Sequence, residues 1–185
     1  KSELIFICVG TPTKKSSNEV DLSFVFKVAK EISKSTKNKK IVVTKSTVPV
    51  GTGDIIENLL KKMKRKNINV ISNPEFLREG TAVADYYNPP LTVLGGDNKV
   101  ALTKIAEIYK KVNGPIEKVG IEVAELIKYV NNSFHALKIT FANEVGNICQ
   151  KLNIDSHEVM RIFGMDKQLN IAYIKLVALQ HQQGK

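Results

Sequence analysis

The sequence has few of the residues that build disulfide frameworks or metal centres. Its 185 residues include two cysteines, Cys8 and Cys149, and three histidines. Neither cysteine has a Cys-x-x-Cys partner or the spacing of a metal site. Both are predicted to be buried thiols in a reducing compartment, which indicates a cytoplasmic protein and no metal centre.

Long apolar runs are missing too. No run approaches the roughly 20 residues that cross a bilayer, and no signal-peptide pattern or cleavage site occurs, so no membrane partner is expected. A hydrophobic fraction of 43% is enough for a packed core. The chain enters a strand pattern almost directly after Lys1, which predicts a fragment of a longer protein.

Acidic residues are fewer than basic ones: the chain has 18 Asp and Glu but 28 Lys and Arg, which gives a net charge of +10. Lysines cluster at 37–40 and 61–66, each at the polar end of a helical pattern, where they complement the helix dipole. No aromatic residues interleave with them, as single-strand binding would favour. A solvated face is therefore favoured over a nucleic-acid patch, although a basic surface can steer a phosphorylated ligand.

Apolar runs alternate with helical patterns along the first two thirds of the chain. The runs are typical of buried parallel strands and lie at 4–9, 41–44, 68–71 and 91–94. Amphipathic helical patterns separate them. This alternation suits right-handed crossovers and predicts an α/β fold, part of a doubly wound, Rossmann-like parallel sheet. In such sheets, ligands bind outside the carboxyl ends of the strands.

After Gly114-Pro115 the pattern changes to a long amphipathic helix from about Ile121 to Leu152. About thirty residues of helix span roughly 45 Å, more than one domain core needs. The helix either links two domains or forms a dimer seam, and it opens an all-α central domain. Asp155 with Glu158 predicts a further helix that stops at Gly164. Its apolar stripe comprises Ile127, Val130, Phe134, Leu137, Phe141, Val145, Ile148 and Leu152.

The stretch at 72–82 follows the third strand, and Pro74 ends the strand ladder there because it has no N–H to donate. Glu75 and Glu79 stand four apart, one turn apart if the segment is helical. Like charges this close need a cation, a donor or a ligand. The local pattern fits either a capped loop into a helix or a substrate loop.

A polar ridge runs beside the apolar stripe of the long helix, at steps of three and four residues. It is either a solvated face or a site. Thr47 follows Ser46 at the end of the second strand, where hydroxyls bind a ligand or cap a turn. Gly51-Thr52-Gly53 starts like a dinucleotide fingerprint, but Ile56 occupies the third glycine position. The ridge consists of Glu125, Lys128, Asn132 and His135.

Four blocks in order resemble the UDP-glucose/GDP-mannose dehydrogenase family. They are Phe6–Pro12, Lys45–Gly51, Asn73–Ala82 and Glu125-x-x-Lys128-x-x-x-Asn132. The resemblance extends to about Asn170, and the segments at 89–93 and 165–170 look closer to the GDP-mannose branch. It implies NAD-dependent, two-step oxidation of the C6 alcohol of a nucleotide sugar, of the UDP-glucose or GDP-mannose type, to the uronate used for polysaccharide precursors. It also implies a homodimer through the long helix.

The resemblance also implies roles for individual residues. Lys128 would stabilise the developing oxyanion, with Asn132 positioning substrate or water. Glu75 would act as general acid and base in the hydrolysis step, and Thr47 would assist at the catalytic water. The cofactor side would comprise Gly10, Thr11, Pro12, Ser46 and Glu79. The nucleotide-sugar cleft would be lined by Phe76, Leu77 and Arg78.

The sequence departs from the family at both ends. The glycine fingerprint unit expected before Lys1 is absent, and the catalytic Cys loop expected after Asn170 is replaced by 172–185. Neither Cys8 nor Cys149 matches that cysteine. The chain is therefore expected to complete neither oxidation. We expect 1–118 to be part of an NAD-binding domain, 119–171 a central helical domain and 172–185 a tail of uncertain origin.

Three alternatives remain open at this stage. The chain could be an interaction module whose long helix mediates dimerisation beside a vestigial site, or a basic nucleic-acid-binding domain, for which only weak binding is expected. Within the enzymes, a related β-hydroxyacid dehydrogenase also pairs such a sheet with a long helix and a Lys-x-x-x-Asn pair. The Pro-Glu-Phe-Leu-Arg-Glu block argues against it.

Overall fold

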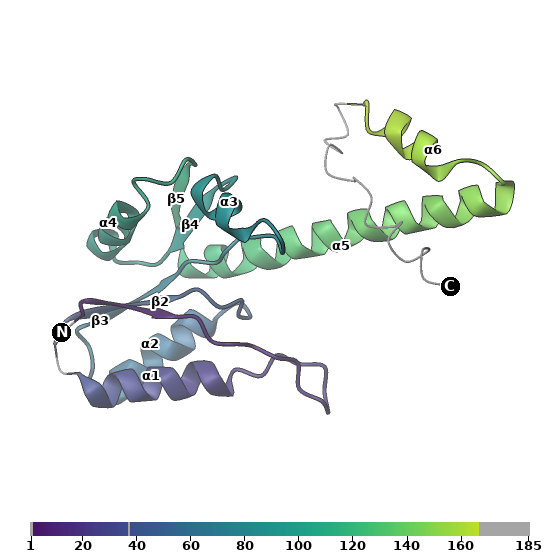
Figure 1. Cartoon of the computed structure of the whole chain (residues 1–185). Helices are drawn as coiled ribbons and strands as arrows, with labels where there is room; N and C mark the ends of the chain where they lie inside the picture. Colours follow the sequence, from purple (N-terminus) through teal and green to yellow (C-terminus); the bar gives the residue numbers. More distant parts are fainter. Residues whose placement is uncertain (1, 37, 167–185) are drawn as a thin grey trace. The chain divides into compact units, whose positions relative to one another are not determined.

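The computed structural model describes residues 2–36 and 38–166 (Figure 1). The chain forms two compact units that divide between Tyr129 and Val130. The strands are β1 (Leu4–Ile7), β2 (Lys40–Thr44), β3 (Ile68–Ser72), β4 (Thr92–Gly95) and β5 (Ile116–Val119). The helices are α1 (Ser23–Ser35), α2 (Thr52–Lys62), α3 (Ala82–Tyr87), α4 (Lys99–Ile108), α5 (Ile121–Leu152) and α6 (Ser156–Phe163). Within these ranges, no helix is both long and apolar enough to cross a bilayer.

The first unit carries a five-stranded sheet in the order β1-β2-β3-β4-β5. The α/β, Rossmann-like prediction is confirmed, because neighbouring strands are parallel except for β3 and β4. That pair is antiparallel, with Ser72 opposite Gly95, so the expectation of crossovers throughout was wrong. The six residues of α3 span about 9 Å, too short to carry the chain back along β3.

The strand β5 was not predicted from the sequence. Its four residues, Ile-Glu-Lys-Val, place two charges between two apolar residues. A run of four that is half charged gives too weak an alternation to distinguish a strand from a loop. It pairs in parallel with β4 and completes the sheet.

The core lies on both faces of the sheet. On one face α1 and α2 pack side by side (Figure 1), and Val42 of β2 meets Val25 and Ile56 there. On the other face α4 packs, and Ile41 and Val43 of β2 meet its side chains. Successive strand residues point to opposite faces, so the continuous apolar run of β2 serves both cores.

The strand β1 lies at one edge of the described sheet. Its sequence is that of a strand buried on both faces, yet Phe6 is 38% exposed. Cys8, just beyond β1, is exposed, so the prediction that both cysteines are buried was wrong for this one; Cys149 is buried as expected. A strand at a sheet edge has a neighbouring strand on one side only. Phe6 and Cys8, at the carboxyl end of β1, are therefore exposed.

The beginning of α5 packs closely on the sheet and on α2. A Cβ atom added to Gly95 would lie 2.3 Å from the Cβ of Ala124, and one added to Gly53 would lie 2.3 Å from Cδ1 of Ile121. Both distances are far inside van der Waals contact. Glycine at these two positions therefore allows the first turns of α5 to approach β4 and α2.

We expect Gly53→Ala to destabilise the chain by about 2 kcal/mol, because the new methyl group displaces Ile121 from its packed position. Denaturation followed by circular dichroism measures the change. Gly146→Ala is the matched control: a methyl group there meets no atom within 4 Å, and replacing a mid-helix glycine gains up to about 1 kcal/mol. Equal effects from both substitutions would contradict the close approach.

The second unit contains the rest of α5 and the helix α6. The predicted span of α5, Ile121–Leu152, is confirmed. Asp155 caps α6, with its Oδ1 accepting the His157 N–H at 2.8 Å, and Gly164 follows the helix as expected. The rings of Phe141 and Phe163 pack 5.4 Å apart. The predicted tail at 172–185, and residues 167–170 of the block shared with the GDP-mannose branch, lie outside the described residues.

Candidate functional site

The segment that follows β3 is irregular from Asn73 to Arg78, and α3 begins only at Ala82. Glu75 and Glu79 therefore do not stand one turn apart on a helix, contrary to one sequence interpretation. Glu75 Oε2 accepts the Leu77 N–H at 2.6 Å, while Oε1 lies 3.1 Å from Lys128 Nζ. Glu79 is exposed in the turn before α3. The two glutamates thus occupy different surroundings.

The cation beside Glu75 comes from the second turn of α5. Lys128 is 5% exposed, and its Nζ lies 5.5 Å from the centre of the Phe76 ring. A buried ammonium needs a carboxylate or donor-rich surroundings to offset its lost hydration. Glu75 provides the carboxylate and Phe76 adds an aromatic face. The loop after β3 and the start of α5 therefore meet at this ion pair.

Asn73 is the first residue of this loop and is buried, with an exposed fraction of 1%. Its Nδ2 donates to the Val93 carbonyl at 2.8 Å. Its Oδ1 accepts hydrogen bonds from Lys45 Nζ, at 3.3 Å, and from the Tyr109 hydroxyl. Its backbone N–H donates to the Thr44 carbonyl at 2.9 Å. One amide side chain therefore connects β2, β4 and the end of α4 at the base of the loop.

Lys45 directly precedes the predicted site residues Ser46 and Thr47, but it was not itself predicted to belong to the site. Burial lowers the pKa of Lys45; the Glu75 carboxylate opposes this shift and the Lys128 ammonium adds to it. Burial raises the pKa of Tyr109 to about 12. The charges of Lys45, Lys128 and Glu75 therefore influence one another.

The loops after β1 and β2 are joined by hydrogen bonds from side-chain hydroxyl groups to backbone carbonyls. Ser46 Oγ donates to the Val9 carbonyl at 2.6 Å, and Thr11 Oγ1 donates to the Thr47 carbonyl at 3.0 Å. Gly10 and Pro12 are exposed beside them, and a Cβ atom on Gly10 would meet nothing within 4 Å. This turn therefore leaves open space in front of its backbone.

The polar ridge predicted on α5 divides into two parts. Glu125 is 2% exposed and accepts the N–H groups of Gly51 and Gly53, both at 2.7 Å. Burial raises the pKa of Glu125, and the two N–H groups oppose that rise. Lys128 is buried at its ion pair, whereas Asn132 and His135 are exposed in the second unit. The spacing predicted a shared helix face but not this difference in burial.

Arg78 forms an ion pair with Asp85 of α3. Its Nη2 lies 2.7 Å from Oδ1 and its Nε donates to Oδ2 at 3.0 Å. The Arg78 N–H and the Thr81 hydroxyl also donate to Oδ2. The Arg78 side chain and N–H hold the pKa of Asp85 well below its ordinary range. Asp85 thereby fixes the shape of the loop between Arg78 and α3.

We expect Asp85→Asn to lower the melting temperature at about pH 7 and to have less effect as the pH falls towards about 2. The folded-state pKa of Asp85 is lowered, so its contribution is present above the ordinary carboxyl pKa of about 4 and is lost as acid protonates the folded form. Thermal unfolding across this range measures it. Glu107→Gln, in an exposed ion pair with Lys110, is the control; a pH-independent difference would contradict the expectation.

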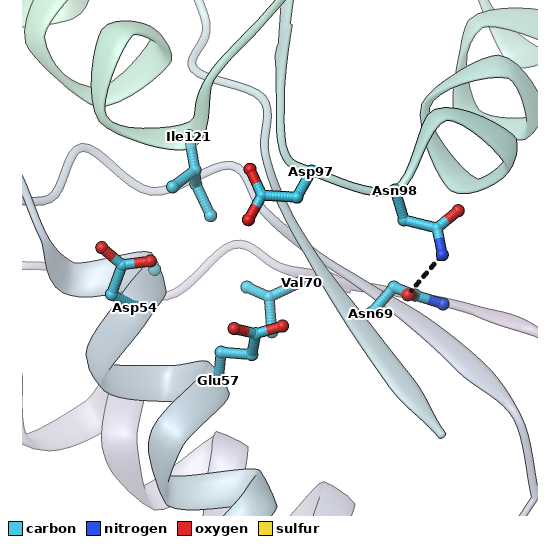
Figure 2. A pocket seen from close by; sticks show the side chains of 8 residues that line it. Asp54, Glu57, Asn69, Val70, Asp97, Asn98 and Ile121 are labelled. Atoms are coloured by element: carbon cyan, nitrogen blue, oxygen red, sulfur yellow. Dashed lines mark hydrogen bonds between the residues drawn. The ribbon is translucent and has the colours of Figure 1, made fainter. Parts of the chain in front are cut away.

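A pocket of about 270 Å³ lies elsewhere in the first unit (Figure 2). Figure 2 shows the side chains of Asp54, Glu57 and Asp97 around it, with Asn98 Nδ2 donating to Asn69 Oδ1 at 2.9 Å. It contains none of the predicted site residues and lies beside the start of β3, whereas Asn73 follows its end. Its carboxylates repel phosphate groups, so it does not suit a nucleotide. Across 2–36 and 38–166, no group of three metal-ligating side chains is placed to hold an ion.

Comparison with protein-family models gives two matches. Residues 1–113 match the model described as UDP-glucose/GDP-mannose dehydrogenase family, NAD binding domain. Residues 122–177 match the central domain of the same family. The two matches follow each other along the chain as the blocks in the sequence predict.

Individual relatives agree with these models. The chain is 39% identical to UDP-glucose 6-dehydrogenase TuaD of Bacillus subtilis, over 94% of this chain and 38% of the relative. It is 42% identical to GDP-mannose 6-dehydrogenase of Pseudomonas aeruginosa, over 92% and 41%. A crystal structure of a ternary complex of GDP-mannose dehydrogenase from Pseudomonas aeruginosa superposes with a TM-score of 0.87, at 41% identity over 92% of this chain and 41% of that chain. The chain thus spans about two fifths of the length of these relatives.

Proposed function

Because the chain belongs to the UDP-glucose/GDP-mannose dehydrogenase family, we propose that it forms part of an NAD-dependent nucleotide-sugar 6-dehydrogenase. The reaction converts the C6 alcohol of a nucleotide sugar to a carboxylate. The observation that carries the proposal is the buried Lys128, paired at 3.1 Å with Glu75 at the carboxyl end of β3. That is the edge of the sheet at which ligands of α/β folds bind.

In this proposal Lys128 and Glu75 have complementary roles. The Lys128 ammonium stabilises negative charge that develops on the substrate oxygen, as a fixed cation in a water-poor site does. Glu75 moves a proton at the water that hydrolyses the thioester, which forms between the sugar C6 carbon and the catalytic cysteine of the complete enzyme. Thr47 holds that water, and Asn132 orients the substrate. The ion pair with Glu75 holds the Lys128 side chain in place until substrate arrives.

The cofactor side comprises the turn at Gly10-Thr11-Pro12 together with Ser46 and Glu79. The open space in front of Gly10 fits close approach of a dinucleotide, and the Thr11–Thr47 hydrogen bond holds the turn. NAD supplies the hydride acceptor when it is bound. Phe76, Leu77 and Arg78 line the nucleotide-sugar cleft, and the Arg78–Asp85 pair fixes their loop.

We further propose that cofactor binding belongs to residues 1–118 and that the following helical part, 119–171, mediates homodimer formation in the cytoplasm. Exposed apolar side chains along α5 support the dimer, because such a stripe needs a covering surface. Light scattering of the chain, compared with a variant carrying Phe134→Ser and Leu137→Ser, tests it. A monomer at every concentration would contradict this part of the proposal.

The test of the activity uses a hybrid enzyme, in which residues 1–166 replace the matching part of GDP-mannose 6-dehydrogenase from Pseudomonas aeruginosa. We expect NADH formation with GDP-mannose or UDP-glucose, measured by absorbance. The unmodified Pseudomonas enzyme is the positive control with GDP-mannose, and UDP-glucose 6-dehydrogenase TuaD of Bacillus subtilis is the positive control with UDP-glucose. A hybrid that folds and binds NAD but forms no NADH with either sugar would overturn the proposal.

A further inference from the structure

The helix α2 begins without a capping side chain of its own. Gly51 is its N-cap residue, with a φ of 87°. The first N–H groups of a helix have no partner within the helix. Here the N–H groups of Gly51 and Gly53 donate to the Glu125 carboxylate of α5. The cap of α2 therefore comes from an element more than seventy residues away.

The position of Glu125 is tightly restricted. It is buried, and a Cβ atom on Gly53 would lie 3.1 Å from its Oε1. Asp54 and Glu122 add like charge to its surroundings. The two N–H groups and the positive end of the α2 dipole offset the loss of hydration. A carboxylate held in this way cannot shift without losing both hydrogen bonds.

Lys128 stands one turn further along the same helix and holds the loop after β3 through Glu75. The first two turns of α5 therefore bind two loops with opposite charges. Glu125 binds the end of the loop that carries Thr47, and Lys128 binds the loop that carries Glu75. Both contacts are made by the first two turns of one helix, which connects the two loops to each other.

We propose that Glu125 is a positioning residue. It fixes the position of the Lys128 ammonium relative to the loop that carries Thr47, without touching substrate or cofactor. The inference rests on the proposed function for its catalytic meaning. Its structural content is that the contact at Gly51 and Gly53 determines the contact between Lys128 and Glu75. A residue that acted only as a helix cap would leave Lys128 in place when lost.

The first experiment uses NMR on the chain as it stands, with Glu125→Gln. The side-chain amide keeps the shape of the carboxylate but has one acceptor atom, so one of the two hydrogen bonds is lost. We expect amide exchange at Gly51 and Gly53 to accelerate about tenfold. We also expect the Leu77 amide and Lys128 ammonium resonances to shift, because both groups contact Glu75.

Glu144→Gln is the matched control, since Glu144 is exposed further along the same helix; it should move none of these signals. Unchanged signals from α4 show that the variant is folded, and Glu125→Asp, which keeps both acceptor atoms, should restore part of the pattern. If Gly51 and Gly53 change while Leu77 and Lys128 do not, Glu125 is a cap alone and the proposal is overturned. No change at any of them overturns it too.

The second experiment measures Glu125→Gln in the hybrid enzyme. We expect kcat to fall about 10- to 100-fold with little change in KM for NAD, as misplacement of a catalytic group produces. If Lys128→Ala lowers kcat but Glu125→Gln does not, the positioning role is overturned and the proposed function stands. If Lys128→Ala has no effect, the proposed function fails, while the NMR result still tests the structural coupling.

Discussion

Replacing Lys128 with alanine in the hybrid enzyme is expected to lower kcat by about 10²- to 10³-fold, the loss typical of removing one group that stabilises an oxyanion. The ammonium is buried at the end of an ion pair, so bulk water cannot replace it at full strength. Because the charge matters most when the oxygen becomes negative, kcat should fall more than KM for the sugar rises.

The measurement is steady-state NADH formation with each nucleotide sugar. Lys151→Ala is the control, since Lys151 is an exposed lysine near the end of the same helix and should leave kcat unchanged. Circular dichroism must show that the Lys128→Ala variant is folded, because loss of the lysine side chain leaves the Glu75 carboxylate without its ion-pair partner. A kcat within a factor of about two of the parent would contradict an oxyanion role for Lys128.

Asn73→Ala is expected to destabilise the chain by about 3 to 5 kcal/mol. The truncation leaves the Val93 carbonyl, the Tyr109 hydroxyl and the Lys45 ammonium without the partner that each has now. An unsatisfied buried polar group costs about 1 to 3 kcal/mol. Few surface substitutions approach this size.

Urea denaturation followed by circular dichroism measures the effect. Asn58→Ala, at an exposed position on α2, is the control and should change the free energy of unfolding by about 0.5 kcal/mol or less. Asn73→Asp tests the direction of the amide: it has nearly the same shape but cannot donate to Val93. A loss below about 1 kcal/mol for Asn73→Ala would show that the surrounding groups find other partners.

The sequence alone predicted most elements because their patterns are local. The runs around Val42 and Ile71 have the length and composition of buried strands, and the periodicity from Ile121 to Leu152 extends for several turns. The direction of β4 was not local information, since it depends on how far α3 carries the chain. The charged residues Glu117 and Lys118 concealed β5 for the same reason: pairing with β4, not composition, makes it a strand.

The candidate site could be predicted in outline but not in its contacts. Four sequence blocks place Glu75 and Lys128 on separate elements, and only the fold brings their charges to 3.1 Å. Asn73 was read as part of a motif, although its partners lie 20 to 36 residues away. Glu125 was read as one member of a ridge, although Gly51 and Gly53 are its partners. Spacing along one helix cannot reveal a partner on another element.

The edge position of β1 has a practical consequence for any laboratory that produces this chain by itself. Its outer row of N–H and C=O groups has no neighbouring strand within the part of the chain that the structure describes, and half-exposed apolar side chains accompany it. Such an edge is a template for any extended peptide, including another copy. Charged substitutions at Phe6, or a co-expressed strand that covers this edge, would therefore keep purified material from aggregating.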